Sequence, residues 1–220
     1  MGAAMSECGF PVMLDLRARR AVVVGLGRVG RRKAASLVAA GAYVMAVEPR
    51  LVPSEPGVIV IAEAFRPAHL DGFSIAMAAA TPEVNRSVVE AARTRGIWVN
   101  SASDPEQGDI LVPASLHLGR LTLSVSTDGA GPAAARSLRD LVSGALPAGV
   151  EEWLELIAEQ RTLVKETVSD PEARRRLFLE WSAPEWAARV AAEGVDAICA
   201  LWEADRLAVL AEGRARPGEH

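Results

Sequence analysis

The fold that we expect is decided by the stretch Ala21-Val-Val-Val-Gly-Leu-Gly-Arg-Val-Gly-Arg-Arg-Lys33. Its small and β-branched residues predict a short buried strand, and the chain from Val29 continues as a helix. Gly25, Gly27 and Gly30 follow the Gly-x-Gly-x-x-Gly spacing: the first permits a tight turn, the second lets a pyrophosphate approach the backbone, and the third lets helix and strand pack closely. Because the helix start offers free N–H groups and a positive dipole end, the stretch predicts a dinucleotide site, against the alternative of a merely structural turn.

A carboxylate follows the next predicted strand, residues 42–47. Glu48 lies 23 positions after Gly25, where an acidic side chain can accept hydrogen bonds from the adenosine ribose hydroxyls. Such a carboxylate would repel a 2′-phosphate, so the sequence favours NAD over NADP as the cofactor. Arg50 weakens that preference, since an arginine could pair with such a phosphate. The alternative is that Glu48 only caps the strand.

Strands and helices alternate through the first half of the chain. Apolar runs at 58–62, 75–80 and 97–99 predict further strands, and a helix through about residue 95 begins after Thr81. This alternation predicts an α/β fold with a Rossmann-like, doubly wound parallel sheet. Ligands of such sheets bind outside the carboxyl ends of the strands, which adds Ala80, Thr81 and Asn100 to the glycine turn and Glu48.

The second half changes character. Strands at 110–114 and 121–127, joined through 115–120, predict a hairpin, which a turn at 128–132 connects to a helix over 133–146. A strand pair and one helix form a small core, so we expect a partner subunit to stabilise them. Beyond this the chain reads as helical to about residue 212, with breaks at Pro171 and Pro184. The expected parts are a Rossmann-like NAD-binding domain, a small α+β dimerisation segment, a helical C-terminal domain and a disordered tail, at residues 1–112, 113–147, 148–213 and 214–220.

The composition excludes several classes of protein. Half of the 220 residues are hydrophobic and 24% are charged, as in globular proteins, and a net charge of −4 gives no sign of a nucleic-acid partner. Cys8 and Cys199 form neither a disulfide framework nor a zinc pattern, which favours a reducing, cytoplasmic compartment. The first 13 residues are no convincing signal peptide, and no apolar run approaches the roughly 20 residues that span a bilayer, so we expect no membrane association.

The order of motifs resembles one family, the precorrin-2 dehydrogenase/sirohydrochlorin ferrochelatase domain of siroheme biosynthesis. The resemblance covers about residues 10–146 and includes the glycine segment ending in Arg32-Lys33. Its other motifs are Leu14-Asp-Leu16, Ala39-Ala-Gly-Ala42, Trp98-Val-Asn100, Asp109-Ile-Leu-Val-Pro-Ala114, Leu121-Thr-Leu-Ser-Val-Ser-Thr-x-Gly129 and Pro132-Ala-x-Ala-Arg136. This combination is more specific than the glycine motif alone.

Membership in this family would imply a homodimer that oxidises precorrin-2, a tetrapyrrole, to sirohydrochlorin with NAD. Some members also insert iron, so Fe²⁺ or another divalent metal is a further expected substrate. By position, Arg28, Val29, Pro49 and Arg50 fall where the family contacts NAD. Ser126 and Thr127, expected with Asn100 to bind substrate, fall in the turn near the family's tetrapyrrole cleft.

The catalytic position departs from the family pattern. The family's main catalytic aspartate stands three residues after the strand-end asparagine, where this chain has Ser103, and Asp104 follows one place later. An aspartate can take up a substrate proton, whereas a serine cannot do so without a neighbouring base. Asp104 could substitute if the loop shifts by one residue, although we favour the reading as an ordinary turn residue before Pro105. His117 is a further candidate for a base or metal ligand, and here too we favour an exposed turn residue.

Three functional hypotheses follow. The first is an NAD-dependent precorrin-2 dehydrogenase, with chelatase activity as its less secure part. The second is a catalytically weakened paralogue that binds tetrapyrrole, metal or nucleotide as a carrier or sensor, and Ser103 motivates it. The third is another oxidoreductase on the same fold, because fold does not determine chemistry.

Overall fold

The computed structural model describes residues 9–214, which divide into two compact units at residues 112 and 113. Unit 1 contains a five-stranded parallel sheet in the order β3-β2-β1-β4-β5. Its strands and helices are β1 (Arg20–Val24), α1 (Arg28–Ala39), β2 (Tyr43–Val47), β3 (Val58–Ile61), η1 (Pro67–Leu70), β4 (Ile75–Ala78), α2 (Pro82–Arg93), β5 (Trp98–Ser101) and η2 (Pro105–Gln107). The predicted doubly wound α/β fold is confirmed.

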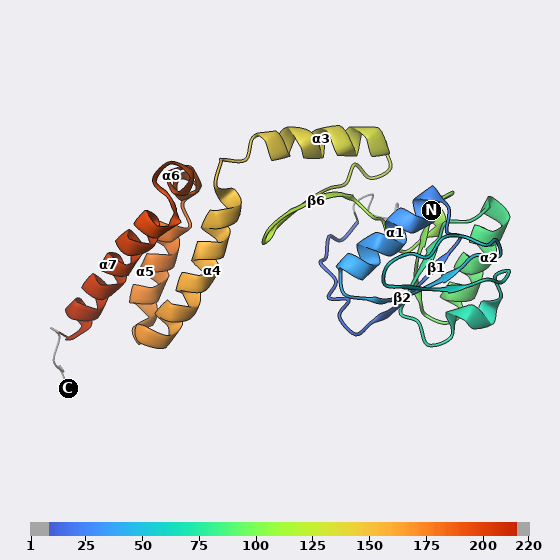
Figure 1. Ribbon diagram of the computed structural model, residues 1–220, viewed down its shortest axis with the longest axis horizontal. Helices are drawn as coiled ribbons and strands as arrows, with labels where there is room; N and C mark the ends of the chain where they lie inside the picture. The colour runs from blue at the N-terminus through green and yellow to red at the C-terminus, as the bar shows by residue number, and fades with distance from the viewer. Residues whose placement is uncertain (1–8, 215–220) are drawn as a thin grey trace, which may run out of the picture. The chain divides into compact units, whose positions relative to one another are not determined.

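Two apolar layers cover the sheet, because alternate residues of a strand face opposite sides. Val22 and Val24 of β1 belong to a core that includes Val88 and Ala92 of α2. Val23 belongs to the core on the other side, with residues of α1. Helices α1 and α2 therefore lie on opposite faces, as Figure 1 shows.

The chain reverses direction across the sheet between β1 and β4. From β1 it proceeds through α1 to β2 and β3, and it then returns to place β4 and β5 on the other side of β1. The carboxyl ends of β1 and β4 therefore flank the point of reversal, which is the place where doubly wound sheets bind ligands.

Unit 2 begins with an antiparallel hairpin that packs against a helix, followed by a bundle of helices (Figure 1). Its elements are β6 (Ala114–Leu118), β7 (Leu121–Val125), α3 (Pro132–Gly144), α4 (Val150–Thr167), α5 (Pro171–Trp181), α6 (Glu185–Glu193) and α7 (Val195–Arg214). Tryptophans dominate the bundle core: the rings of Trp181 and Trp202 stack with their centroids 4.8 Å apart, and the Trp153 indole N–H donates to the carbonyl of Trp181 at 3.0 Å. Pro171 and Pro184 begin new helices as predicted, and Gly194 adds a break that the sequence analysis missed.

The predicted position of the hairpin was wrong by about four residues. The run 110–112 continues unit 1, because the N–H groups of Asp109 and Ile110 both donate to the carbonyl of Val99. Pro113 has no N–H for a strand ladder, so β6 begins only at Ala114. His117 therefore lies within a strand and not in the connecting turn, which Gly119 makes with a φ of +51°.

Helix α7 ends at Arg214, one residue into the predicted disordered tail. The remainder of that tail and Cys8 lie outside the described residues. Within residues 9–214, none of the helices is both long enough and apolar enough to cross a membrane.

Candidate dinucleotide site

The glycine turn joins three elements at the carboxyl ends of the strands. Gly25 has a φ of +92°, its N–H donates to the carbonyl of Val47 at 2.9 Å, and a Cβ built on it would lie 2.6 Å from the carbonyl oxygen of Ala79. A Cβ on Gly30 would lie only 1.9 Å from the carbonyl oxygen of Gly25. Glycine is therefore required at both positions for β1, α1 and β4 to approach so closely.

The start of α1 is open to a ligand. Among the described residues, no atom lies within 4 Å of a Cβ built on Gly27, and no side chain caps the helix there. The first turn also contains no acidic residue, while the side chains of Arg28 and Val29 are exposed. The free N–H groups and the positive helix end fit the pyrophosphate of a dinucleotide.

Glu48 stands at the end of β2 as predicted, but it is buried and fully engaged by the protein. One carboxylate oxygen accepts from the N–H of Leu26 at 2.9 Å and from Nη2 of Arg50 at 3.1 Å. The other accepts from Nε of Arg50 at 2.8 Å and from its backbone N–H at 3.2 Å. The hydrogen bonds from Arg50 and Leu26 outweigh burial and lower the pKa of the Glu48 carboxyl to about 2.

This carboxylate therefore braces the glycine turn through Leu26. Its predicted role as an acceptor for the ribose hydroxyls stays a prediction, although four donors already occupy its lone pairs. Pro49 and Arg50 beside it are exposed.

A buried asparagine organises the neighbouring edge of the sheet. The side-chain oxygen of Asn85 accepts from the N–H of Ala80 at 2.8 Å, and its amide nitrogen donates to the hydroxyl of Ser103 at 2.9 Å. Thr81 caps α2, and its hydroxyl accepts from the N–H of Val84. Ala80, Thr81 and Ser103 thus meet at the carboxyl ends of β4 and β5, as the sequence predicted for this edge.

Asp104 lies beside Ser103 at the start of the short helix η2 and is partly buried. Its Oδ2 accepts from the side-chain amide of Gln107 at 2.7 Å, and its N–H donates to the hydroxyl of Ser101 at 3.3 Å. These local bonds fit the turn role that we favoured, and they leave Oδ1 without a bond among those that the structure contains for residues 9–214. A catalytic role for Asp104 or Ser103 stays a prediction.

Asn100, which we expected to bind substrate, uses both ends of its amide within unit 1. Its oxygen accepts from Nζ of Lys33 at 2.6 Å, and its nitrogen donates to the carbonyl of Ile110 at 2.7 Å. Burial lowers the pKa of the Lys33 ammonium, and the nearby guanidinium of Arg32 lowers it further. The amide thus ties α1 and β5 to the segment that leads out of unit 1.

The remaining candidates lie in unit 2. His117 is exposed on β6, and its Nδ1 lies 3.0 Å from the hydroxyl of Thr122 on β7. Ser126 accepts from the N–H of Asp128, and Thr127 donates to the carbonyl of Gly131, so both hydroxyls shape the turn before α3. In the described part of the chain, no three His, Cys, Asp or Glu side chains are grouped to hold a metal ion.

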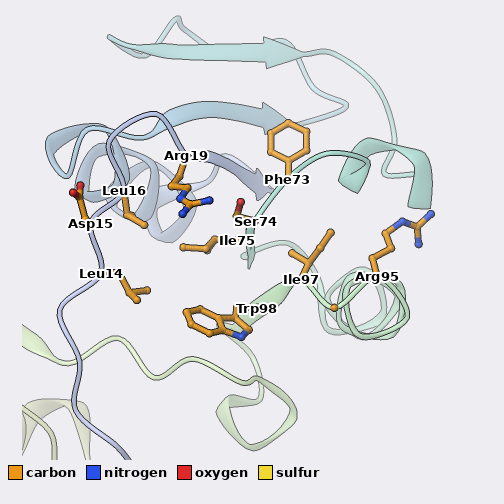
Figure 2. A pocket seen from close by; sticks show the side chains of 11 residues that line it. Leu14, Asp15, Leu16, Arg19, Phe73, Ser74, Ile75, Arg95, Ile97 and Trp98 are labelled. Atoms are coloured by element: carbon orange, nitrogen blue, oxygen red, sulfur yellow. The ribbon is translucent and has the colours of Figure 1, made fainter.

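A pocket of about 460 Å³ lies at the opposite edge of the sheet, by the amino-terminal ends of β4 and β5 (Figure 2). Ile75 and Trp98 line it from these strands, Ser74 from the residue before β4, and Leu14 and Arg19 from the segment before β1. Because β1 to β5 run parallel, this pocket is separate from the glycine turn. Nothing in the sequence analysis predicted it.

Sequence reasoning also missed two site residues, Asn85 and Lys33. Asn85 breaks the apolar stripe of α2, which is the available signal, because a polar residue at a buried helical position requires hydrogen-bond partners. Lys33 lies in a basic run next to the glycine turn, and only the packing of α1 on the sheet shows that its ammonium points inward to Asn100.

Comparisons with known proteins agree with this geometry. Residues 12–114 match a protein family described as "Putative NAD(P)-binding", which confirms the predicted dinucleotide cofactor. The chain is 38% identical over 176 residues to a siroheme synthase of Chromobacterium violaceum, an alignment that covers 77% of this chain and 37% of the relative. It is 36% identical over 177 residues to a siroheme synthase of Methylobacillus flagellatus, covering 77% and 38%. The chain thus spans a little over a third of the length of these relatives.

One solved structure has the same fold over nearly its whole length. This protein, described as SirC, a precorrin-2 dehydrogenase, is 22% identical and superposes with a TM-score of 0.74, covering 89% of this chain and 99% of its own. The likeness extends beyond unit 1, and it supports the same order of sheet, hairpin and helices.

Proposed function

We propose that this chain belongs to the precorrin-2 dehydrogenase family and catalyses the NAD-dependent oxidation of precorrin-2 to sirohydrochlorin in siroheme biosynthesis, which the matches to an NAD(P)-binding family and to siroheme synthases support. The observation that carries the proposal is the open start of α1 at Gly27, on the edge of the sheet where Ser103 and Asp104 also lie. The cofactor and the residues that would handle a substrate proton share that edge.

The reaction removes a hydride and a proton from the macrocycle, which together amount to two electrons and two protons. NAD, when bound, supplies the acceptor for one hydride, and the second hydrogen leaves as a proton. The protein's task is to hold the two molecules in register and to accept or pass on the proton.

The glycine turn would hold the cofactor. The N–H groups that follow Gly27 would bind the pyrophosphate, while Gly25 and Gly30 keep the turn close to β4. Glu48 keeps the turn in place by accepting from Leu26, so its contribution to cofactor binding is positional.

For the proton we propose Asp104, because its Oδ2 accepts from Gln107 while its Oδ1 keeps its acceptor capacity. Ser103 accepts from Asn85, so its own hydroxyl hydrogen is available to donate to a substrate carboxylate. Asp104→Asn should then lower turnover at least tenfold with little change in NAD binding. Turnover equal to that of the unmodified chain would show that Asp104 does not act in the reaction.

The carrier or sensor hypothesis remains the second candidate, because Ser103 stands where the family has its catalytic aspartate. Metal insertion needs a proton acceptor still more, since it removes two pyrrole protons. We keep Fe²⁺ insertion as a subsidiary proposal, and we also keep the cytoplasmic location that the cysteine usage favours.

We further propose that a second copy of the chain covers one face of α3. Leu138, Leu141 and Val142 share that face at helical spacing and are 45%, 70% and 42% exposed, although the helix packs on the hairpin with its other side. Leu141→Glu should convert a dimer into a monomer in sedimentation equilibrium. Leu179→Glu, at a leucine 67% exposed on α5, is the matched control and should leave the dimer intact.

The proposed activity is tested with the purified full chain, NAD and precorrin-2. We expect NADH to form together with the absorption spectrum of sirohydrochlorin. Binding of both ligands without NADH above the enzyme-free rate would favour the carrier, and binding of neither would reject both hypotheses.

A further inference from the structure

The end of β2 carries an ion pair where many dinucleotide-binding proteins carry a free carboxylate. A carboxylate has about four lone-pair sites, and those of Glu48 meet four donors, one from Leu26 and three from Arg50. The Glu48 side chain is only 3% exposed. It therefore has no acceptor left for two ribose hydroxyls without losing an internal bond.

The charge of the carboxylate is also compensated. A free acid at this position selects NAD because it binds the ribose 2′-hydroxyl and repels a 2′-phosphate. Here the guanidinium lies against both oxygens, at 2.8 and 3.1 Å, so the local charge facing the ribose sums to about zero. The repulsion that would exclude NADP is largely absent.

Arg50 retains donors that point away from the pair. Its guanidinium has five N–H groups, of which Glu48 receives one from Nε and one from Nη2. Three remain, and the side chain is 73% exposed. A phosphate monoester could receive two of them in the bidentate geometry that guanidinium groups favour.

We propose that Arg50 is the residue of this site that reads the adenosine ribose, and that the chain binds a 2′-phosphorylated dinucleotide, NADP, about as well as NAD. The inference rests on the proposed dinucleotide site but not on the identity of the tetrapyrrole substrate. Glu48 holds the guanidinium in place by accepting two hydrogen bonds from it, and Arg50 supplies the contact to the adenosine ribose.

The test measures binding directly, through the fluorescence change on titrating the full chain with NADH or NADPH at low ionic strength. In the unmodified chain the two Kd values should agree within about fivefold. Arg50→Ala should raise the Kd for NADPH at least tenfold and that for NADH less than threefold. Arg50→Gln, which keeps a hydrogen-bond donor for Glu48, should show the same selective loss without disturbing the turn.

The matched control is Arg66→Ala. Arg66 is 66% exposed and pairs with Glu63 on the surface of unit 1, so its loss changes the net charge equally. Both Kd values should change less than twofold. In the unmodified chain, 2′,5′-ADP should displace NADPH tenfold more strongly than 5′-AMP does. The loss of this difference in the Arg50 variants would confirm that the 2′-phosphate is the group recognised.

Two results would overturn the inference. NADH binding with a Kd for NADPH a hundredfold higher would show that Glu48 excludes the phosphate. Equal weakening of NADH and NADPH by both Arg50 variants would show that Arg50 only braces the turn. Failure of the unmodified chain to bind either dinucleotide would instead reject the cofactor site of the proposed function.

Discussion

Removing the charge of Glu48 should destabilise unit 1 by an amount that depends on pH. In Glu48→Gln the amide oxygen can still accept from Leu26, but the amide nitrogen now faces the guanidinium of Arg50, donor against donor. The bidentate ion pair is lost, and the unfavourable contact falls on a position 48 side chain that is itself buried.

The magnitude follows from the pKa of the carboxyl. A pKa that moves from an ordinary 4.5 to about 2 on folding corresponds to about 3 kcal/mol of stability at pH 7. Because the folded pKa is the lower one, this stability is fully present above pH 4.5 and is lost as the pH falls toward 2. The difference between the unmodified chain and Glu48→Gln should therefore narrow by about 2 kcal/mol between pH 7 and pH 3.

Hydrogen exchange read by mass spectrometry suits this prediction, because peptides from β1 and β2 report on unit 1 separately from unit 2. Intrinsic exchange rates change with pH equally in both proteins and cancel in the comparison. Glu63→Gln, which breaks a surface pair with Arg66, is the control and should cost less than about 1 kcal/mol at every pH. A difference for Glu48→Gln that is below 1 kcal/mol at pH 7, or that does not vary with pH, would refute the bracing role.

The remaining predictions concern three further positions. Gly30→Ala should abolish NADH binding and lower the melting temperature of unit 1, since its Cβ would lie 1.9 Å from the carbonyl oxygen of Gly25; unchanged binding would contradict the close approach. Ser103→Asp should raise turnover of precorrin-2 at least tenfold by restoring a carboxylate, and no gain would mean that the site does not depend on a base there. Gly149→Ala should destabilise unit 2 by about 2 kcal/mol or more, because Gly149 has a φ of +75° and its Cβ would lie 2.4 Å from a carbonyl oxygen of α6. In the matched control Gly144→Ala, urea unfolding should show no loss, since nothing lies within 4 Å of that Cβ.

The sheet of unit 1 was predictable because its signals are local. The apolar run at β1, the glycine spacing and the proline after Thr81 each determine their own segment, and alternation of strands and helices then leaves few topologies. The position of the site at the carboxyl ends of the strands also follows from this order of strands and helices.

The hairpin was placed too early because hydrophobicity alone cannot say which core a strand-like run joins. Residues 110–112 are as apolar as a strand, yet Ile110 packs on unit 1 and bonds to Val99. Whether residues 110–112 belong to the hairpin or to unit 1 depends on the hydrogen-bond partner of each backbone group, and that partner is known only from the tertiary structure.

The site was predictable in its location but less so in its chemistry. Position in the chain placed Glu48 correctly, whereas its engagement depends on where the fold brings the backbone N–H of Leu26, 22 residues earlier, and on how the side chain of Arg50 is oriented. The same holds for Asn100, whose partner Lys33 lies on a helix 67 residues away and whose partner Ile110 lies in a loop 10 residues away.

We propose that this chain transfers a hydride from precorrin-2 to a dinucleotide held at Gly27. The most direct measurement records NADH and sirohydrochlorin simultaneously, by absorbance, in an anaerobic reaction of the full chain with NAD and precorrin-2. We predict one NADH for each sirohydrochlorin, both lost in Gly30→Ala. Sirohydrochlorin formation without NADH, or no NADH above the enzyme-free rate from a protein that binds both ligands, would contradict the claim.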